Sequence, residues 1–232
     1  RLDILMKMYV IAFFYRNSFP IPFKDDSISL RLEHFAEIFK INTANAHDAL
    51  EDCDYLKQLL NEIKSSLPNF YNEFITTTSK IDLFEHLITN KLHYLCTYIP
   101  SNKTIRSIPF TALVTEEAKN QTIIFNLIND PEDYFDLNIQ ELRDLIDDKK
   151  KTPFKVIGIN KSLPSICANT LAKDNLLPKE NAQYLKRAKM LQSNPDFIHK
   201  INEIYDDIEK PIYANSYNEE QLYSGGFPTK ID

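Results

Sequence analysis

A histidine and an aspartate five residues apart are the side chains in this sequence best suited to chemistry. They are His47 and Asp52, in the segment NAHDALED that begins at Asn45. A carboxylate at position 52 can hold a metal ion, and a histidine one turn earlier can take a proton from a water beside that ion. The same spacing also fits a surface histidine and a carboxylate that borders solvent.

The element that must position these two side chains is a helix beginning after Asn45. Apolar residues recur there at helical spacing, at Ala49, Cys53, Leu56, Leu60 and Ile63. Asp52 falls on the same face, which is otherwise given to the core. Burying an unpaired charge costs several kcal/mol or more, so this carboxylate needs a cation, hydrogen-bond donors or a metal ion. We therefore expect a buried face with Asp52 as its charged member.

Other elements follow from capping residues and from β-branched stretches. Asp3 is expected to cap a first helix that runs to about Phe14, and Ser29 to cap a short second helix. Asn138 and Glu141 have the spacing of a capping box. Three stretches rich in β-branched and aromatic residues, separated by polar turns, predict a β-meander over residues 92–99, 105–115 and 122–129.

Composition excludes several classes of protein. With 43% hydrophobic residues among 232, the chain can bury a sizeable core. Lys7 and Arg16 interrupt its most apolar stretch, so no membrane span is predicted. The three cysteines are odd in number and far apart, which favours a reducing cytoplasm over a disulfide framework or a thiolate metal site. A net charge of −6 disfavours wholesale wrapping by nucleic acid but permits a local basic track.

Other chemistries find little support in the sequence. Only three glycines are present, so no glycine loop for nucleotides and no nucleophile elbow is predicted. Cys53 belongs to the predicted buried face and is a poor candidate for a nucleophile. The remaining histidines are scattered without ligand spacing and are expected to be structural: His34, His86, His93 and His199.

Four segments of the chain resemble one family of nucleases. The stretch RLEHF that begins at Arg31, followed by NAHDALED, closely resembles the end of the nuclease domain of bacterial exodeoxyribonuclease I. The likeness continues through the INK stretch that begins at Ile159 and the QLYSG stretch that begins at Gln221. These enzymes are DEDDh 3′→5′ exonucleases, in which the final His and Asp stand five residues apart. The resemblance covers nearly the whole chain.

The resemblance implies a role for each residue of the His-Asp pair. His47 would be the general base that activates the attacking water, and Asp52 the last of four acidic residues that hold two Mg²⁺ ions. The family's Asp-x-Glu pair and its middle Asp have no counterpart here, so three of the four acidic ligands are absent. The intact protein would remove mononucleotides from the 3′ end of single-stranded DNA, as a DNA-repair hydrolase, and the chain alone would be inactive.

The resemblance also implies an α+β fold and a division into domains. Residues 1–66 would be the helical C-terminal remnant of an RNase H-like exonuclease domain. Residues 67–212 would form a Src-homology-3-like β-barrel domain with added helices. Residues 213–232 would be a linker toward a helical domain that the chain lacks. The chain is thus expected to be an internal fragment.

Three exposed cations are the candidates for contacts with DNA: Arg31, Lys161 and Arg16. The resemblance implies two partners, single-stranded DNA and the acidic tail of single-stranded DNA-binding protein, and a monomer is expected. Two alternatives stay open on the sequence alone. The chain can be a non-catalytic module that binds DNA or a protein, or an unrelated α+β interaction domain in which His47 and Asp52 are incidental.

Overall fold

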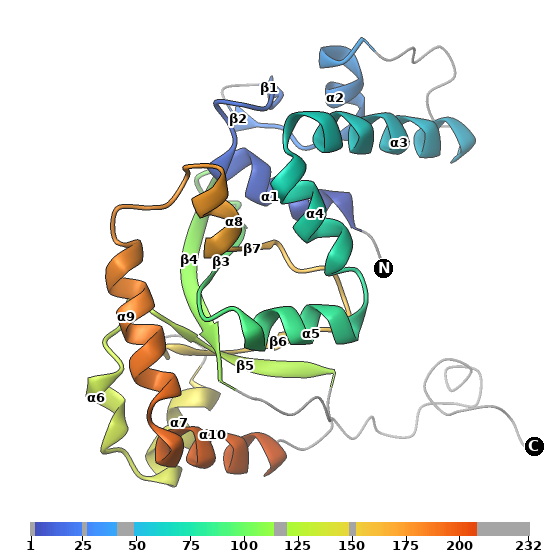
Figure 1. The fold of residues 1–232 in the computed structure, drawn as a ribbon. Coiled ribbons are helices and arrows are strands. Elements are labelled where there is room, and N and C mark those ends of the chain that lie inside the picture. Colours follow the sequence, from blue (N-terminus) through green and yellow to red (C-terminus); the bar gives the residue numbers. More distant parts are fainter. Residues whose placement is uncertain (1–2, 25–26, 41–48, 114–119, 149–151, 208–232) are drawn as a thin grey trace, which may run out of the picture.

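The computed structural model describes residues 3–24, 27–40, 49–113, 120–148 and 152–207 (Figure 1). Within these residues the helices are α1 (Ile4–Phe14), α2 (Leu32–Ile38), α3 (Ala49–Ser66), α4 (Pro68–Thr76), α5 (Lys80–Thr89), α6 (Glu132–Phe135), α7 (Ile139–Asp147), α8 (Ala168–Lys173), α9 (Asn181–Gln192) and α10 (Pro195–Asp207). The strands are β1 (Phe23–Lys24), β2 (Ser27–Ile28), β3 (His93–Ile99), β4 (Thr104–Ala112), β5 (Gln121–Asn126), β6 (Phe154–Gly158) and β7 (Ser165–Cys167).

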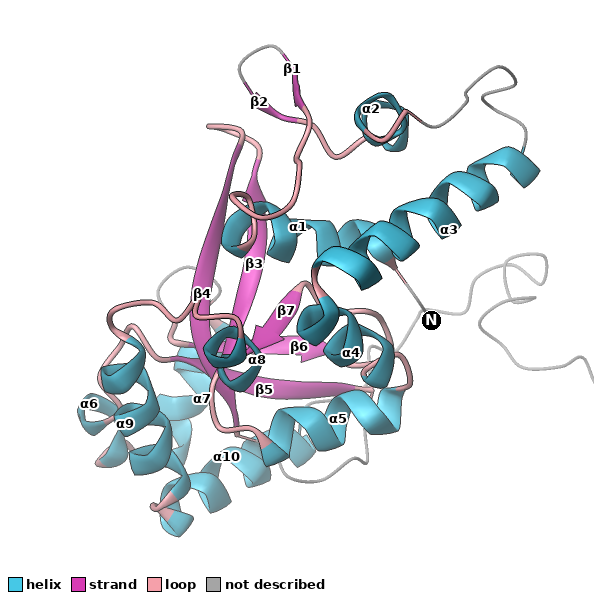
Figure 2. Cartoon of the chain, turned by 45° about the horizontal axis from the view of Figure 1, so that its top comes forward, coloured by secondary structure: helices cyan, strands magenta, loops and turns pink. Residues whose placement is uncertain are grey.

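The centre of the fold is a five-stranded antiparallel sheet in the order β6-β5-β4-β3-β7. Strands β3, β4 and β5 are sequential neighbours, so the predicted meander is confirmed. Strand β4 pairs with β3 along its length, from Thr104 to Phe110, but with β5 only from Phe110 to Ala112. Figure 2 shows the consequence, because β3 and β4 run together while β5 crosses below them. The sheet therefore bends sharply where β4 passes from one partner to the other.

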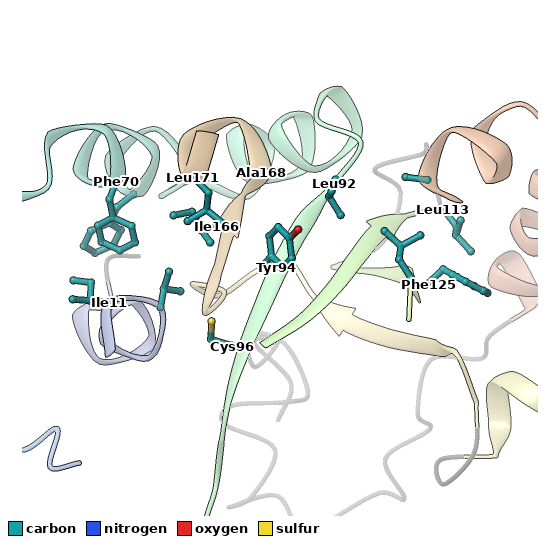
Figure 3. Packing of buried hydrophobic residues seen from close by; sticks show 14 of the residues in the cluster. Ile11, Phe70, Leu92, Tyr94, Cys96, Leu113, Phe125, Ile166, Ala168 and Leu171 are labelled. Atoms are coloured by element: carbon teal, nitrogen blue, oxygen red, sulfur yellow. The ribbon is translucent and has the colours of Figure 1, made fainter. Parts of the chain in front are cut away.

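Side chains alternate between the two faces of the sheet along each strand, and helices or other segments cover both faces. On β3, Leu95 packs in one cluster with Leu83, Phe84 and Leu87 of α5. Its neighbours Tyr94 and Cys96 belong to the larger cluster on the other side. Figure 3 shows that larger cluster, in which residues of the sheet meet helical residues. Helices around a covered antiparallel sheet confirm the predicted α+β class.

Helix α1 packs directly on the sheet. Its buried Met8 and Ile11 share the larger cluster with Tyr94 of β3 and Ile166 of β7. Residues on the two sides of the expected division at residue 66 thus share one core. Among the described residues, no helix combines the length and the apolar character that crossing a membrane requires.

Capping was predicted correctly at two helices and wrongly at a third. Asp3 accepts a hydrogen bond from the Met6 amide at 3.3 Å, and Asn138 and Glu141 exchange the two hydrogen bonds of a capping box. Ser29 does not cap α2, which begins at Leu32. Its amide donates to the carbonyl of Pro22 at 2.9 Å, so Ser29 still belongs to the hairpin of β1 and β2.

A lysine is buried where α1 meets the sheet, which the sequence pattern did not predict. Lys7 is 3% exposed, and its ammonium group donates to the carbonyl oxygen of Ser165 at 3.2 Å. The same nitrogen lies 5.7 Å from the centre of the Phe74 ring. Burial lowers the pKa of Lys7 to about 8, although the carboxylate of Glu73 opposes that shift. The charged lysine therefore costs stability at neutral pH.

We predict that the stability of the protein depends on Lys7 at alkaline pH. The folded-state pKa lies below the unfolded value, so the unfolded chain holds its proton up to a higher pH and the folded state gains stability as pH rises above 8. Between pH 7 and pH 10 the free energy of unfolding should rise, relative to Lys7→Met, by about 2 kcal/mol. Urea denaturation of both proteins at the two pH values measures this difference. Parallel pH profiles would contradict it.

Candidate functional site

The two residues predicted to do the chemistry fall at the start of α3. His47 lies among residues 41–48, outside the described residues. Asp52 lies within α3 (Ala49–Ser66), but its side chain is also outside the described part of the structure. Their assignments as base and metal ligand therefore stay predictions. What the structure does give is the path and the surroundings of the helix that carries Asp52.

Helix α3 turns to the core a face that agrees only in part with the predicted one, since Ile63 was expected to be buried and is. Its deeply buried residues are Tyr55, Leu59 and Ile63, which are 5%, 2% and 0% exposed. Cys53 is exposed and Leu56 is 38% exposed, so the expected burial of these two is wrong. The helix carries two apolar stripes at helical spacing, and only contact with α1, α2 and α4 decides which one is covered.

The uncovered stripe lines an open hollow against α1. This α1–α3 hollow has a volume of about 610 Å³ and is lined by Asp3, Ile4, Leu5, Cys53, Leu56, Lys57 and Leu60. Leu5 is 45% exposed. An apolar surface of this kind on two adjacent helices is typical of a face that another segment or partner covers. The segment of α3 that contains Asp52 thus leads directly into an uncovered apolar surface.

The described residues contain no complete magnesium site. Only one group of three or more potential metal ligands lies close together within them, and it consists of two histidines and a cysteine. Magnesium requires oxygen ligands, so this group is not a magnesium site. No catalytic step can be assigned from the described geometry alone.

A second hollow lies beside the first and contains one of the predicted cations. This Arg31 hollow has a volume of about 350 Å³ and is lined by Leu5, Tyr9, Ile28, Ser29, Leu30, Arg31 and Tyr98. Leu5 lines both hollows, so they meet at α1. The residues come from α1, the segment around β2 and the end of β3, which the packing of α1 on the sheet brings together.

The chemistry of the Arg31 hollow suits an unpaired nucleic-acid strand. The rings of Tyr9 and Tyr98 are nearly parallel, with an interplanar angle of 11° and centroids 6.3 Å apart. The Arg31 side chain is 75% exposed and lies 3.3 Å from Glu33, a surface pair worth little energy that a phosphate can replace. Aromatic faces beside an exposed guanidinium offer stacking for bases and charge for the backbone.

The other two predicted cations do not line this hollow. Arg16 is exposed just past the end of α1, and Lys161 is exposed just past the end of β6. The side chain of Lys161 turns back toward the end of β6. Its Cε lies beside Gly158, 3.5 Å from the position that a Cβ atom of that residue would take. Their predicted contacts with DNA are not tested by the described geometry.

Comparison with known proteins gives a family match and a curated relative. The family model of the exonuclease I SH3-like domain matches residues 83–207. Exodeoxyribonuclease I of Escherichia coli strain K12 is 26% identical over 229 residues, which cover 89% of this chain and 46% of the relative. The chain therefore spans about half the length of this relative.

Solved structures of the same relative share the fold. E. coli exonuclease I in complex with a dA16 oligonucleotide matches with a TM-score of 0.66 and 25% identity, over 99% of this chain and 52% of that one. A structure described as an ExoI/SSB-Ct complex matches with a TM-score of 0.62 and 23% identity, over 99% of this chain and 50% of that one. The likeness extends over helices and sheet together.

We predict that the Arg31 hollow binds single-stranded DNA by stacking and by charge. Tyr98→Ala should raise the Kd for a short oligonucleotide between roughly fivefold and a hundredfold, because one stacked base is worth about 1–3 kcal/mol. Arg31→Ala should weaken binding and lower the slope of log K against log salt concentration by about 0.7. Calorimetric titration at several salt concentrations measures both effects.

Matched variants separate these contacts from general effects. Tyr98→Phe retains the ring and Arg31→Lys retains the charge, so both should bind nearly as the wild type does. Arg143 of α7 forms an ion pair with Asp207 of α10 at 2.6 Å, and it serves as a distant control. Equal losses from Arg143→Ala and Arg31→Ala would show that the hollow has no special role.

Proposed function

The chain belongs to the family of exonuclease I SH3-like domains, and from this membership we propose that the intact protein is a 3′→5′ exonuclease. It removes mononucleotides from the 3′ end of single-stranded DNA. The observation that supports this most is the likeness over 99% of the chain to an exonuclease I that was solved with an oligonucleotide. The hollow beside the helix that carries Asp52, and the Arg31 hollow that adjoins it at Leu5, also support it.

In this proposal the chain supplies two residues of the catalytic centre. Asp52 holds a metal ion and His47 takes the proton of the attacking water. The ions are Mg²⁺, which bind oxygen ligands and stabilise the attacking and leaving oxygens at phosphorus. Helix α3 is held to the core by Tyr55, Leu59 and Ile63, so its first turn has a rigid support.

The other carboxylates would come from residues outside this chain. The α1–α3 hollow is the surface that they and their sheet would cover, because it is apolar and adjoins the segment that carries Asp52. The proposed domains stay as residues 1–66 for the nuclease part, 67–212 for the Src-homology-3-like part and 213–232 for a linker. A monomer in a reducing cytoplasm is proposed, and free Cys53, Cys96 and Cys167 agree with that compartment.

Single-stranded DNA would pass through the Arg31 hollow toward the catalytic centre. Tyr9 and Tyr98 would stack on bases, while Arg31, Arg16 and Lys161 would contact phosphates. The proposed protein partner is single-stranded DNA-binding protein, since a related exonuclease I was solved in a complex described as ExoI/SSB-Ct. Its acidic tail would be met by an exposed arginine, with Arg16 and Arg31 as candidates.

A second candidate function is a binding module without catalysis. The absence of a magnesium-type ligand group among the described residues favours it for this chain taken alone. The two functions differ in what the chain contributes, since a module needs the Arg31 hollow and has no use for His47 or Asp52.

We predict that Asp52→Asn in the intact protein lowers turnover at least about a hundredfold, because even partners of metal ligands contribute tenfold to a hundredfold. The fold should be retained, since the substitution changes one oxygen to an amide nitrogen. Release of nucleotides from labelled single-stranded DNA measures the rate. Asp54→Asn, two residues along on the exposed side of α3, is the matched control and should retain activity. Wild-type rates in Asp52→Asn would refute the assignment.

We also predict that the 232-residue chain alone releases no nucleotides. Its carboxylate set is incomplete, so it cannot hold two magnesium ions. Incubating the pure chain with single-stranded DNA and Mg²⁺, beside the intact protein at equal concentration, checks this. Magnesium-dependent release by the chain, abolished by Asp52→Asn, would show that a full site exists within it.

A further inference from the structure

Two histidines from consecutive elements and a cysteine distant in sequence meet inside the fold. His86 comes from α5, His93 from the start of β3 and Cys167 from the end of β7. His93 and Cys167 are direct partners across the β3–β7 pair, so their side chains share one face of the sheet. The ring of His86 lies 5.3 Å from that of His93. One ring nitrogen of each histidine and the sulfur of Cys167 all lie within 4.8 Å of one another.

These three side chains lie in a nearly dry environment. His93 is 1% exposed and Cys167 2%, while the side chain of His86 is 21% exposed. Nε2 of His93 faces a carbonyl oxygen, which can only accept a hydrogen bond, so Nε2 carries the proton and Nδ1 carries the lone pair. The ring of His93 is fixed by a 2.8 Å hydrogen bond between its Nε2 and the carbonyl oxygen of Asn90.

A buried carboxylate supports the cluster from behind. Glu73 of α4 is 9% exposed, and its Oε1 lies 3.1 Å from Nε2 of His86 and accepts from the amide of Cys167 at 2.8 Å. Burial would raise the pKa of Glu73, but His86, Thr170 and Lys7 together hold it below its usual value. Its Oε2 is buried without a well-formed hydrogen bond. A carboxylate behind a histidine is the usual outer partner of a metal-bound imidazole.

One member of the cluster borders a hollow. This hollow of about 250 Å³ is lined by Cys167 and further by Asn90, Lys91, Leu92, Ala168 and Asn169, with others from α8 and α9. Its lining includes the cysteine but neither histidine, so it adjoins the Cys167 side of the cluster. A water molecule in this hollow can occupy a fourth position on a bound ion.

We propose that His86, His93 and Cys167 bind a zinc ion, with Glu73 as the carboxylate that orients His86 and a water as the fourth ligand. Two imidazoles and a thiolate are borderline-soft ligands that favour zinc over magnesium. This site is separate from the magnesium site proposed at Asp52 and does not depend on the nuclease function. It links α5, β3 and β7, so its role is to stabilise the junction of these elements.

Binding requires a small inward movement and the loss of one proton. Tetrahedral zinc with ligands at about 2.0–2.3 Å holds its ligand atoms about 3.5 Å apart, so atoms within 4.8 Å must approach by about 1 Å. Rotation of the partly exposed His86 ring can supply that movement. The thiol proton of Cys167 leaves to solvent, the new bond being zinc to sulfur.

The test uses cobalt(II) and zinc on the full chain after removal of metals with a chelator. Excess Mg²⁺ is kept present to occupy oxygen-rich sites. Cobalt should produce a thiolate-to-metal charge-transfer band in the near ultraviolet and the visible bands of tetrahedral cobalt, and zinc should abolish both. Zinc should also raise the melting temperature. Absence of the charge-transfer band in the wild-type chain would overturn the proposal.

Variants identify the ligands. Cys167→Ser should lose the charge-transfer band, and His86→Gln should retain the fold and bind zinc at least about tenfold more weakly. Controls are Cys96→Ser, a buried cysteine outside the cluster, and Cys53→Ser, an exposed one; both should bind as the wild type does. Circular dichroism verifies folding. A band that survives Cys167→Ser but is lost in Cys53→Ser would assign the metal to the surface and refute the site.

Discussion

The burial of one carboxylate constrains how the helices meet the sheet. Glu73 of α4 accepts hydrogen bonds where β7 ends and where α5 passes, and it lies in the field of Lys7 from α1. An uncompensated buried carboxylate costs several kcal/mol, so these groups must all be in place together. Helices α1, α4 and α5 are thereby fixed relative to β7. Both hollows beside α1 and the histidine-cysteine cluster take their geometry from that arrangement.

The position of α1 on the sheet explains where the α1–α3 hollow and the Arg31 hollow lie. The helix buries Met8 and Ile11 against the strands and leaves Leu5 exposed between two hollows. One hollow gathers two tyrosines and Arg31 from three separate segments. The other leaves an apolar stripe of α3 open near Asp52. The helix that carries Asp52 and the Arg31 hollow thus lie near each other because both adjoin α1.

Local patterns in the sequence were enough to predict much of the fold. Asp3 and the Asn138–Glu141 box cap their helices as predicted, since capping depends on residues within one turn. The meander followed from β-branched stretches and turns. Ser29 does not cap α2 because that helix begins only at Leu32, with Arg31 at the N-cap position, and the Ser29 hydroxyl lies 2.6 Å from Nδ1 of His34 instead. The buried face of α3 was assigned to Cys53 and Leu56, because two apolar stripes of similar strength compete and only tertiary contact selects Leu59.

The buried cluster could not be predicted from spacing. His93 and Cys167 meet through β7, a strand of three residues that is too short to give a periodic signal. Lys7 likewise gave no sign of burial, because its partner Ser165 lies on that same strand. Residues 47 and 52 were singled out by their spacing and by the resemblance, and their roles stay predictions.

The most direct measurement follows the order of products from single-stranded DNA labelled at one end and digested by the intact protein. With Mg²⁺ present, a label at the 3′ end should appear at once as a mononucleotide, while a label at the 5′ end should be released last. Chelation of the metal should stop both. Early release of the 5′ label, internal cuts, or nucleotide release without metal would contradict a 3′→5′ exonuclease built on His47 and Asp52.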